Sequence, residues 1–286
     1  QMKFHEEILM EIKIMDFNQL KSMTSSFTST EKMPVLFLGH GSPMNAIEEN
    51  IFVEGWRNIG KSIPKPNAIV CISAHWETKG TKVTALQQPK TIHDFYGFPQ
   101  ALFDVQYPAP GSPELADEIK NLIKTSDVEL DKMWGFDHGS WSVIKFLYPE
   151  ADVPMIELSL DVYKTPKQHY ELAKELNVLR RKGVLIVGSG NVVHNLRAMD
   201  WHNPTGGFDW AIEANETFKE IVTSNDHQQL FNFFEKGPAF NMAVPSLEHY
   251  LSLIYSLALQ EKDEEVTLFN DQLIYGSLGM LSFKIG

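Results

Sequence analysis

Short, uninterrupted apolar runs constrain the possible folds of this chain more than any other sequence feature. The runs PVLFL (34–38), AIVCIS (68–73) and VLIVGSG (184–190) are too short for buried helices and do not alternate with polar residues. Strands have this composition when helices cover both faces of a parallel sheet. We therefore predict an α/β fold with three layers, α/β/α, around a mostly parallel central sheet.

Amphipathic segments separate these runs and are predicted to form the outer layers. The segment 165–183 is typical, with Pro166 at its start and Gly183 at its end, which are common helix start and stop residues. We predict helices over 46–61, 113–125, 140–148, 165–183, roughly 207–235 and 246–260. We predict further strands over 81–86 and 153–160 and in the two apolar stretches that close the chain. Segment 87–112 is rich in Pro and Gly in its second half and is predicted to be an irregular loop.

The first 33 residues differ from the rest. They carry apolar residues at roughly helical spacing and end in the polar stretch SSFTST. We predict that residues 1–33 are an appended extension, helical or partly disordered, without chemistry of its own. Residues 34–286 would then form the single domain that carries the function.

Charge and cysteine content narrow the class of protein. The net charge of −12 argues against nucleic acid or an anionic membrane as a partner. No run of about 18 apolar residues predicts a membrane span, and no secretory signal is visible. The single cysteine, Cys71, lies in an apolar run and is predicted to be buried, so no intramolecular disulfide can form and we expect a reducing, cytoplasmic location.

Histidines follow three of the predicted strands. His40 lies between two glycines in GHGSP, His75 follows in SAHW, and His194 ends GSGNVVHN. The carboxyl ends of parallel strands meet at one edge of a sheet, so these imidazoles are expected to lie close together. Neutral imidazoles bind Fe(II) and Zn(II), and three protein ligands leave positions open for water or substrate. At each position the alternative to a metal ligand is an ordinary histidine in a turn or in the core.

Several other kinds of site are disfavoured by the motifs. A zinc site built on cysteine pairs is excluded by the single cysteine, and HExxH is absent. The phosphate-binding patterns GxGxxG and GxxxxGK[ST] are absent too. GHGSP and DHGSW do not match the GxSxG turn of α/β-hydrolases, so a serine triad is not favoured.

Six blocks of the sequence together resemble a known family. They are LFLGHGSPMNAIEEN, IVCISAHWETKGTKVTA, TIHDFYGFPQALFDVQYPAPGSPELA, WGFDHGSWSVIKFLYPEADVPMIELSLD, IVGSGNVVHNLR and PSLEHYLSLIYSLA. In this order they resemble the class III extradiol ring-cleavage dioxygenases, and most closely the DODA-type branch of 4,5-DOPA extradiol dioxygenases and their bacterial relatives. The resemblance runs from about Pro34 to Gly286.

The resemblance implies a set of site residues. It implies a non-haem Fe(II), with Zn(II) often found in the same place in bacterial members. The metal ligands would be His40, His75 and His249, with His194 as the acid–base residue or a fourth ligand, His138 as a second catalytic histidine, and His93 and Asp94 as substrate-binding residues. Other class III enzymes use two histidines and a carboxylate, and here Glu248 precedes His249. Neighbouring helical residues point about 100° apart, so only one of the two can face the metal.

The implied activity is cleavage of the ring of a DOPA-like catechol by O2 to a muconic semialdehyde-type product. Trp76, Phe95, Tyr96 and Trp141 are candidates for an aromatic wall around the catechol. The expected assembly is a monomer or a small homo-oligomer. Two alternatives remain open: a zinc-dependent hydrolase on the same scaffold, and a non-catalytic protein that binds metal and catechol. Oxygen-dependent turnover of a catechol would distinguish the dioxygenase from both.

Overall fold

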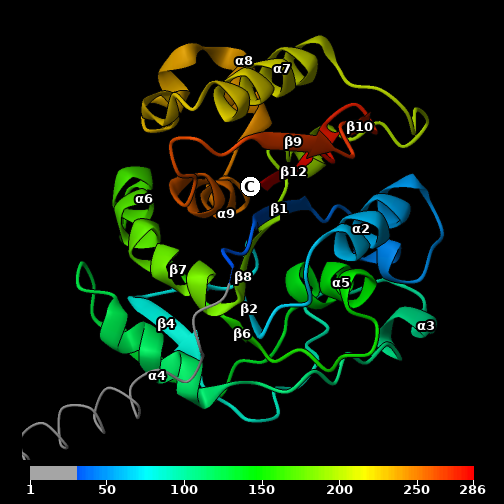
Figure 1. The fold of residues 1–286 in the computed structure, drawn as a ribbon. Helices are drawn as coiled ribbons and strands as arrows, with labels where there is room; N and C mark the ends of the chain where they lie inside the picture. Colours follow the sequence, from blue (N-terminus) through cyan, green and yellow to red (C-terminus); the bar gives the residue numbers. More distant parts are fainter. Residues whose placement is uncertain (1–30) are drawn as a thin grey trace, which may run out of the picture.

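A six-stranded sheet forms the centre of the computed structural model, which describes residues 31–286 (Figure 1). Its strands, in spatial order, are β6 (Met155–Glu157), β2 (Ala68–Ser73), β8 (Val184–Gly190), β1 (Val35–Gly39), β12 (Ser282–Ile285) and β9 (Val266–Phe269). The first four strands are mutually parallel, while β12 runs antiparallel to both β1 and β9. The predicted α/β fold with a mostly parallel sheet is confirmed.

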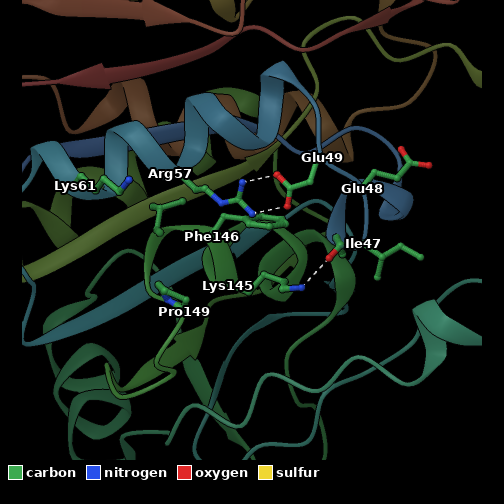
Figure 2. Close-up of a pocket in the computed structure, with 10 residues that line it drawn as sticks. Ile47, Glu48, Glu49, Arg57, Lys61, Lys145, Phe146 and Pro149 are labelled. Carbon is green, nitrogen blue, oxygen red and sulfur yellow. Dashed lines mark hydrogen bonds and ion pairs between the residues drawn. The ribbon is translucent and has the colours of Figure 1, made fainter.

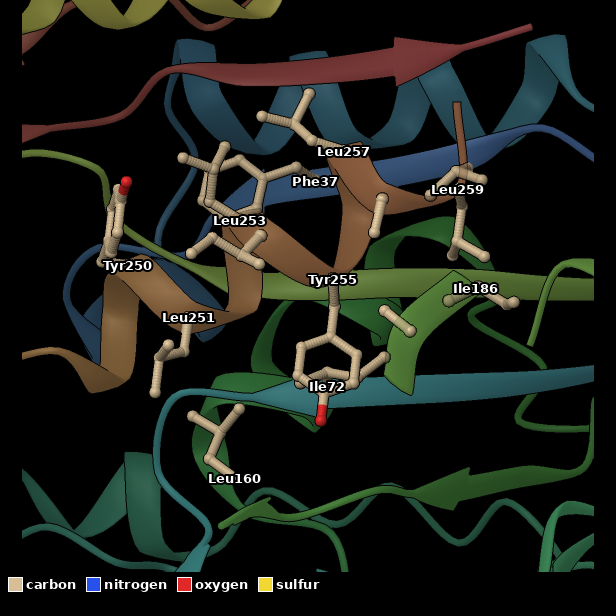
Figure 3. Packing of buried hydrophobic residues seen from close by; sticks show 14 of the residues in the cluster. Phe37, Ile72, Leu160, Ile186, Tyr250, Leu251, Leu253, Tyr255, Leu257 and Leu259 are labelled. Atoms are coloured by element: carbon tan, nitrogen blue, oxygen red, sulfur yellow. The ribbon is translucent and has the colours of Figure 1, made fainter. Parts of the chain in front are cut away.

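Helices cover both faces of this sheet. On one side lie α2 (Ile51–Ser62) and α5 (His138–Leu147), and on the other lie α9 (Glu248–Ala258) and α6 (Pro166–Glu175) (Figure 1). Helix α9 is buried from His249 to Ala258. Its Leu253 and Leu257 belong to one buried cluster with Phe37 of β1 (Figure 3). A helix that is apolar on all sides is stable only inside a core.

Smaller elements surround the three layers. The short strands form two-stranded sheets: β3 (Glu77–Thr78) with β7 (Leu160–Asp161), β4 (Thr81–Thr84) with β5 (Val128–Asp131), and β10 (Leu273–Ile274) with β11 (Leu278–Gly279). The remaining α-helices are α3 (Gln100–Phe103), α4 (Pro113–Leu122), α7 (Asp209–Ser224) and α8 (Pro238–Ala243). The 3₁₀ helices are η1 (Pro43–Ala46), η2 (Leu176–Lys182), η3 (Leu196–Ala198), η4 (His227–Leu230) and η5 (Phe233–Lys236). Among the described residues, no helix combines the length and apolar character needed to cross a membrane.

Two predicted strands differ from the structure. The strand predicted over 81–86 is β4, which pairs with β5 outside the central sheet. The strand predicted over 153–160 is divided into β6, at the edge of the main sheet, and β7, which pairs with β3. Apolar content indicated that these segments are extended, but the partner of a strand depends on residues far away in the sequence.

Helix boundaries also differ, and local capping explains three of the differences. Helix α2 begins only at Ile51, because the Asn50 side chain accepts from the amides of the first turn. Asp137 caps α5 in the same way, so this helix begins at His138. The long helix predicted over 207–235 ends at Ser224, where Asn225 takes a left-handed conformation with φ 57°. Helix 165–183 is α6 followed by η2.

Candidate metal centre and active site

Three strand ends converge on one cavity, as the sequence predicted. His40 directly follows β1, His75 comes two residues after β2, and His194 comes four residues after β8. These three side chains line a cavity of about 450 Å³ together with His138 and His249. Five of the ten histidines of the chain therefore meet at the carboxyl edge of the sheet.

The five imidazoles form one continuous cluster of neighbouring rings. Nε2 of His40 lies 3.1 Å from Nε2 of His75. The ring centres of His40, His75 and His249 are separated by 5.0, 5.1 and 5.3 Å. The His138 ring centre lies 3.9 Å from that of His75, and His194 stacks on His249 at 3.6 Å.

The glycines at the end of β8 bring α9 into place. A Cβ atom at Gly188 would lie 2.3 Å from the carbonyl oxygen of Ser252, and one at Gly190 would lie 2.6 Å from that of His249. Both separations are too short for any side chain, so the first turn of α9 rests directly on the strand backbone. The glycines of the motif GSG (188–190) therefore allow α9 to pack closely on β8, which places His249 at the cavity. The motif only superficially resembles a phosphate-binding loop.

Hydrogen bonds hold two of the rings in fixed orientations. Nδ1 of His40 lies 2.9 Å from the hydroxyl of Ser189. Nδ1 of His249 accepts from the backbone amide of Asn191 at 3.1 Å, which leaves the proton of the neutral ring on Nε2. Either nitrogen of His249 can meet an ion only once the Asn191 contact has opened: Nδ1 because the amide occupies its lone pair, and Nε2 because its proton must first move to Nδ1.

Asp94 fixes the position of His138. Its carboxylate accepts from the backbone amide of His138 at 2.8 Å and from Nδ1 of the same residue at 2.9 Å. Burial alone would raise the pKa of Asp94, but the hydrogen bonds and charge of His138 outweigh it and lower that pKa. Because the ionised carboxylate can only accept, Nδ1 of His138 carries a proton and Nε2 is the nitrogen free to exchange one.

Four of the five imidazoles, those of His40, His75, His194 and His249, are neutral at physiological pH. Burial lowers the pKa values of His40 and His249 well below the usual range, and neighbouring imidazoles lower them further. Burial and the charge of His138 lower the pKa of His75 to about 3 and that of His194 to about 4. Neutral rings keep lone pairs available, which is the form that binds metal ions.

Two groups of donor atoms in this cluster could hold a metal ion. In one group, the ligand atoms of His40, His75 and His138 lie within 4.8 Å of one another, and in the other group those of His194, Glu248 and His249 do so. Three imidazoles that bind one tetrahedral ion at about 2.1 Å have ring centres about 5.2 Å apart. The spacing of His40, His75 and His249 fits this value, whereas the 3.9 Å between His75 and His138 is too short.

Apolar side chains form the outer wall of the cavity. They come from the loop 95–98, from the segment 196–201 that begins with η3, and from β11: Phe95, Tyr96, Phe98, Leu196, Met199, Trp201 and Leu278. Tyr96 and Trp201 are 91% and 70% exposed, so they stand at the mouth. Of the four predicted wall residues, only Phe95 and Tyr96 line the cavity. Trp201 was missed, although its place on the segment after His194 could have indicated it.

The other predicted aromatic and substrate-binding residues lie behind this wall or deeper in the protein. Trp141 is fully buried and donates to the carbonyl of Ile92 at 2.8 Å, while Trp76 stacks on Trp134. His93 contacts Phe95 and bonds through Nε2 to the carbonyl of Val105 at 2.9 Å. Asp94 lines the cavity but His93 does not.

A second cavity of about 490 Å³ lies between α2 and α5 (Figure 2). Two of its charged groups are already engaged: Arg57 pairs with both carboxylate oxygens of Glu49, and Lys145 donates to the carbonyl of Ala46 at 2.6 Å. It offers no catalytic pair comparable to the histidine cluster.

Comparison with known proteins agrees with this geometry. Residues 34–280 match the family described as the catalytic LigB subunit of aromatic ring-opening dioxygenase. The chain belongs to the LigB family. It is an extradiol ring-cleavage dioxygenase of that family, as the resemblance predicted.

Relatives of the family extend over almost the whole chain. A protein named 4,5-DOPA dioxygenase extradiol from Escherichia coli K12 is 47% identical over 262 residues, which cover 90% of this chain and 96% of the relative. The protein of the same name from Mirabilis jalapa is 35% identical over 82% of this chain and 89% of its own. A crystal structure of an uncharacterized Escherichia coli K12 protein superposes with a TM-score of 0.78 at 42% identity, covering 89% of this chain and all of that one.

Proposed function

We propose that this LigB-family enzyme cleaves a DOPA-like catechol with O2, using Fe(II) held by His40, His75 and His249. The observation that carries the proposal is the convergence of five imidazoles, four of them with lowered pKa values, in one cavity with an apolar wall. The names of the relatives in Escherichia coli and Mirabilis jalapa support a substrate related to DOPA.

The donor set fits such an ion. Imidazole binds both Fe(II) and Zn(II), and three protein ligands leave positions for a catechol and for O2. When bound, a ferrous ion would acidify the catechol hydroxyls and bring the two substrates together. Zn(II) would occupy the same ligands without supporting redox chemistry.

His194 is the general base of the proposal. Its ring lies against His249, so it is close to the ion without belonging to the triangle of ligands. The backbone holds it there, because its amide donates to the carbonyl of Ala243 at 2.8 Å and it forms a bridge with Leu278. A neutral imidazole at this position can take a proton from a catechol hydroxyl.

The pair of Asp94 and His138 is the second proton-transfer unit. Asp94 keeps the proton on Nδ1 of His138, so Nε2 can accept a proton from the substrate and later return it to a substrate oxygen during ring cleavage. The ring of Phe95 packs edge-on against His138 at 5.6 Å and limits the access of water to this side. Phe95 and Tyr96 offer flat apolar surfaces on which a catechol ring can lie.

The test is reconstitution with Fe(II) under anaerobic conditions, followed by a panel of catechols that includes DOPA in air-saturated buffer. We expect one O2 to be consumed per catechol, with a yellow ring-opened product. The same protein loaded with Zn(II) is the control and should consume none. Turnover of an ester or amide by the zinc form, without oxygen uptake, would instead support a hydrolase. Binding of catechols without conversion by the iron form would support a binding protein.

A further inference from the structure

The hydroxyl of Ser189 lies between a proposed metal ligand and the start of helix α5. It lies 2.9 Å from Nδ1 of His40 and donates to the carbonyl of Gly139, the residue after His138. We propose that Ser189 is a positioning residue that keeps the proton of His40 on Nδ1 and so presents the Nε2 lone pair to the cavity. This role concerns the binding of any cation at the site and does not depend on which reaction follows.

The number of protons available fixes the direction of the contact between Ser189 and His40. A serine hydroxyl has one proton and can accept through its oxygen lone pairs. The carbonyl of Gly139 can only accept, so the single proton of Ser189 is given to it. The hydroxyl oxygen then has only acceptor capacity left toward His40. The short contact is therefore a hydrogen bond from Nδ1–H of His40 to Ser189, and Nε2 carries the lone pair.

Among residues 31–286, Nδ1 of His40 has no hydrogen-bond partner other than Ser189. His40 is 2% exposed and Ser189 is fully buried, so bulk water does not replace the hydroxyl. Side chains alternate between the two faces of a strand, so Ser189 lies on the same face of β8 as Leu185 and Val187. These two residues pack on the side of the sheet that α2 and α5 cover, and this places the serine hydroxyl beside α5. The flanking glycines point to the opposite face, against α9.

Loss of the hydroxyl should change the preferred tautomer of His40. Without an acceptor at Nδ1, the ring gains by placing its proton on Nε2, where the Nε2 atom of His75 lies 3.1 Å away. A cation must then displace that proton before His40 can bind. Removing a group that orients a metal-binding histidine typically weakens metal affinity by about 10–100-fold.

The experiment compares three variants by a readout other than turnover. Ser189→Ala removes the hydroxyl, Ser189→Thr keeps it, and Ser256→Ala is the matched control. Ser256 is also a fully buried serine, but its hydroxyl donates to the carbonyl of Leu36, away from the histidines. Zn²⁺ affinity is measured by competition with a chromophoric chelator, and folding is checked by circular dichroism.

We expect Ser189→Ala to bind Zn²⁺ about 10–100-fold more weakly than the unmodified chain, with Ser189→Thr recovering most of the affinity. Ser256→Ala should retain the affinity even if its stability falls. A folded Ser189→Ala variant that binds within about twofold of the unmodified chain would overturn the proposal, because the hydroxyl would then serve only to satisfy the Gly139 carbonyl.

A second measurement covers the case in which Ser189→Ala does not fold. In the metal-free unmodified chain, ¹⁵N NMR of the imidazole nitrogens should show a proton on Nδ1 of His40. A proton on Nε2 instead would contradict the proposal without any variant. Since this reading needs neither metal nor catechol, its failure is distinguishable from a failure of the proposed dioxygenase function.

Discussion

Replacing Asp94 by Asn tests the proton-transfer unit most sharply. The carboxylate accepts two hydrogen bonds from His138, one from the backbone amide and one from Nδ1. An Asn side chain has one acceptor oxygen and one donor nitrogen. If its oxygen keeps the backbone amide, its NH2 group faces Nδ1, and the proton of the His138 ring must move to Nε2. The nitrogen that faces the cavity then can no longer accept a proton.

The expected loss follows from that change of tautomer. General acid–base groups supply about 10²–10⁴-fold in rate, so Asp94→Asn should slow turnover by a factor in that range. Stability should fall by about 1.5–3 kcal/mol, the range for a hydrogen bond to a charged group. The side chain of Asp94 is 17% exposed, which places the loss toward the lower end.

The assay is single-turnover ring cleavage by iron-loaded protein, with iron content and urea unfolding measured on the same sample. Asp104→Asn is the control, because it makes the same change at an exposed position whose partner is Gln100. A rate within about threefold of the unmodified enzyme, at unchanged iron content, would refute the role of the pair. Loss of iron in proportion to rate would refute it too, since Asp94 would then act on the ligand His75, 3.7 Å away.

Four further outcomes are expected. His194→Ala should keep its iron while turnover falls about 10²–10⁴-fold, and iron loss that parallels the rate would make this residue a ligand. Gly190→Ala should weaken metal binding, measured by chelator competition, because a Cβ atom there would lie 2.6 Å from a carbonyl of α9. Glu264→Gln should cost about 3–5 kcal/mol at pH 7, because it leaves the buried Arg180 without its carboxylate. Burial raises the pKa of Glu264, but hydrogen bonds from Arg180 and Lys32 outweigh it and lower that pKa to about 2. Ionised Glu264 therefore stabilises the fold fully above its ordinary pKa, and this stabilisation is lost as the pH falls toward 2. The free energy of unfolding should consequently depend less on pH in this acid range in the variant than in the unmodified chain. Removal of residues 1–30 should leave ring cleavage intact, whereas a truncation reaching Met33 should destabilise the fold, because Met33 exchanges hydrogen bonds with Arg180.

The central sheet, and the edge of it at which the histidines gather, could be predicted from the sequence because both depend on local composition. Runs such as AIVCIS and VLIVGSG are strands wherever both faces are covered, and all of their residues are buried here. Cys71 is buried and free, as its position in such a run indicated. The rule that parallel strands end at one edge was enough to bring His40, His75 and His194 together.

Other features depend on contacts that no local pattern contains. Strand β5 carries the sequence VELD, with only Val128 buried, and it is extended because β4 lies beside it. The pairing of Asp94 with His138 joins residues 44 positions apart in the sequence, and that of Ser189 with His40 joins residues 149 apart. Ser189 lies in a predicted strand, but only the packing of α9 and α5 on opposite faces of β8 explains why a serine lies between two glycines there. The predicted extension over 1–33 lies outside the described residues except for its last three.

The ligand set is the central claim, and a crystal structure of protein loaded anaerobically with Fe(II) or Zn(II) tests it most directly. We predict an ion about 2.0–2.3 Å from one nitrogen each of His40, His75 and His249. His138 should stay bound to Asp94 and outside the coordination sphere. An ion held by His138 in place of His249, or a structure in which these three imidazoles lie more than about 6 Å from any bound ion, would contradict this assignment.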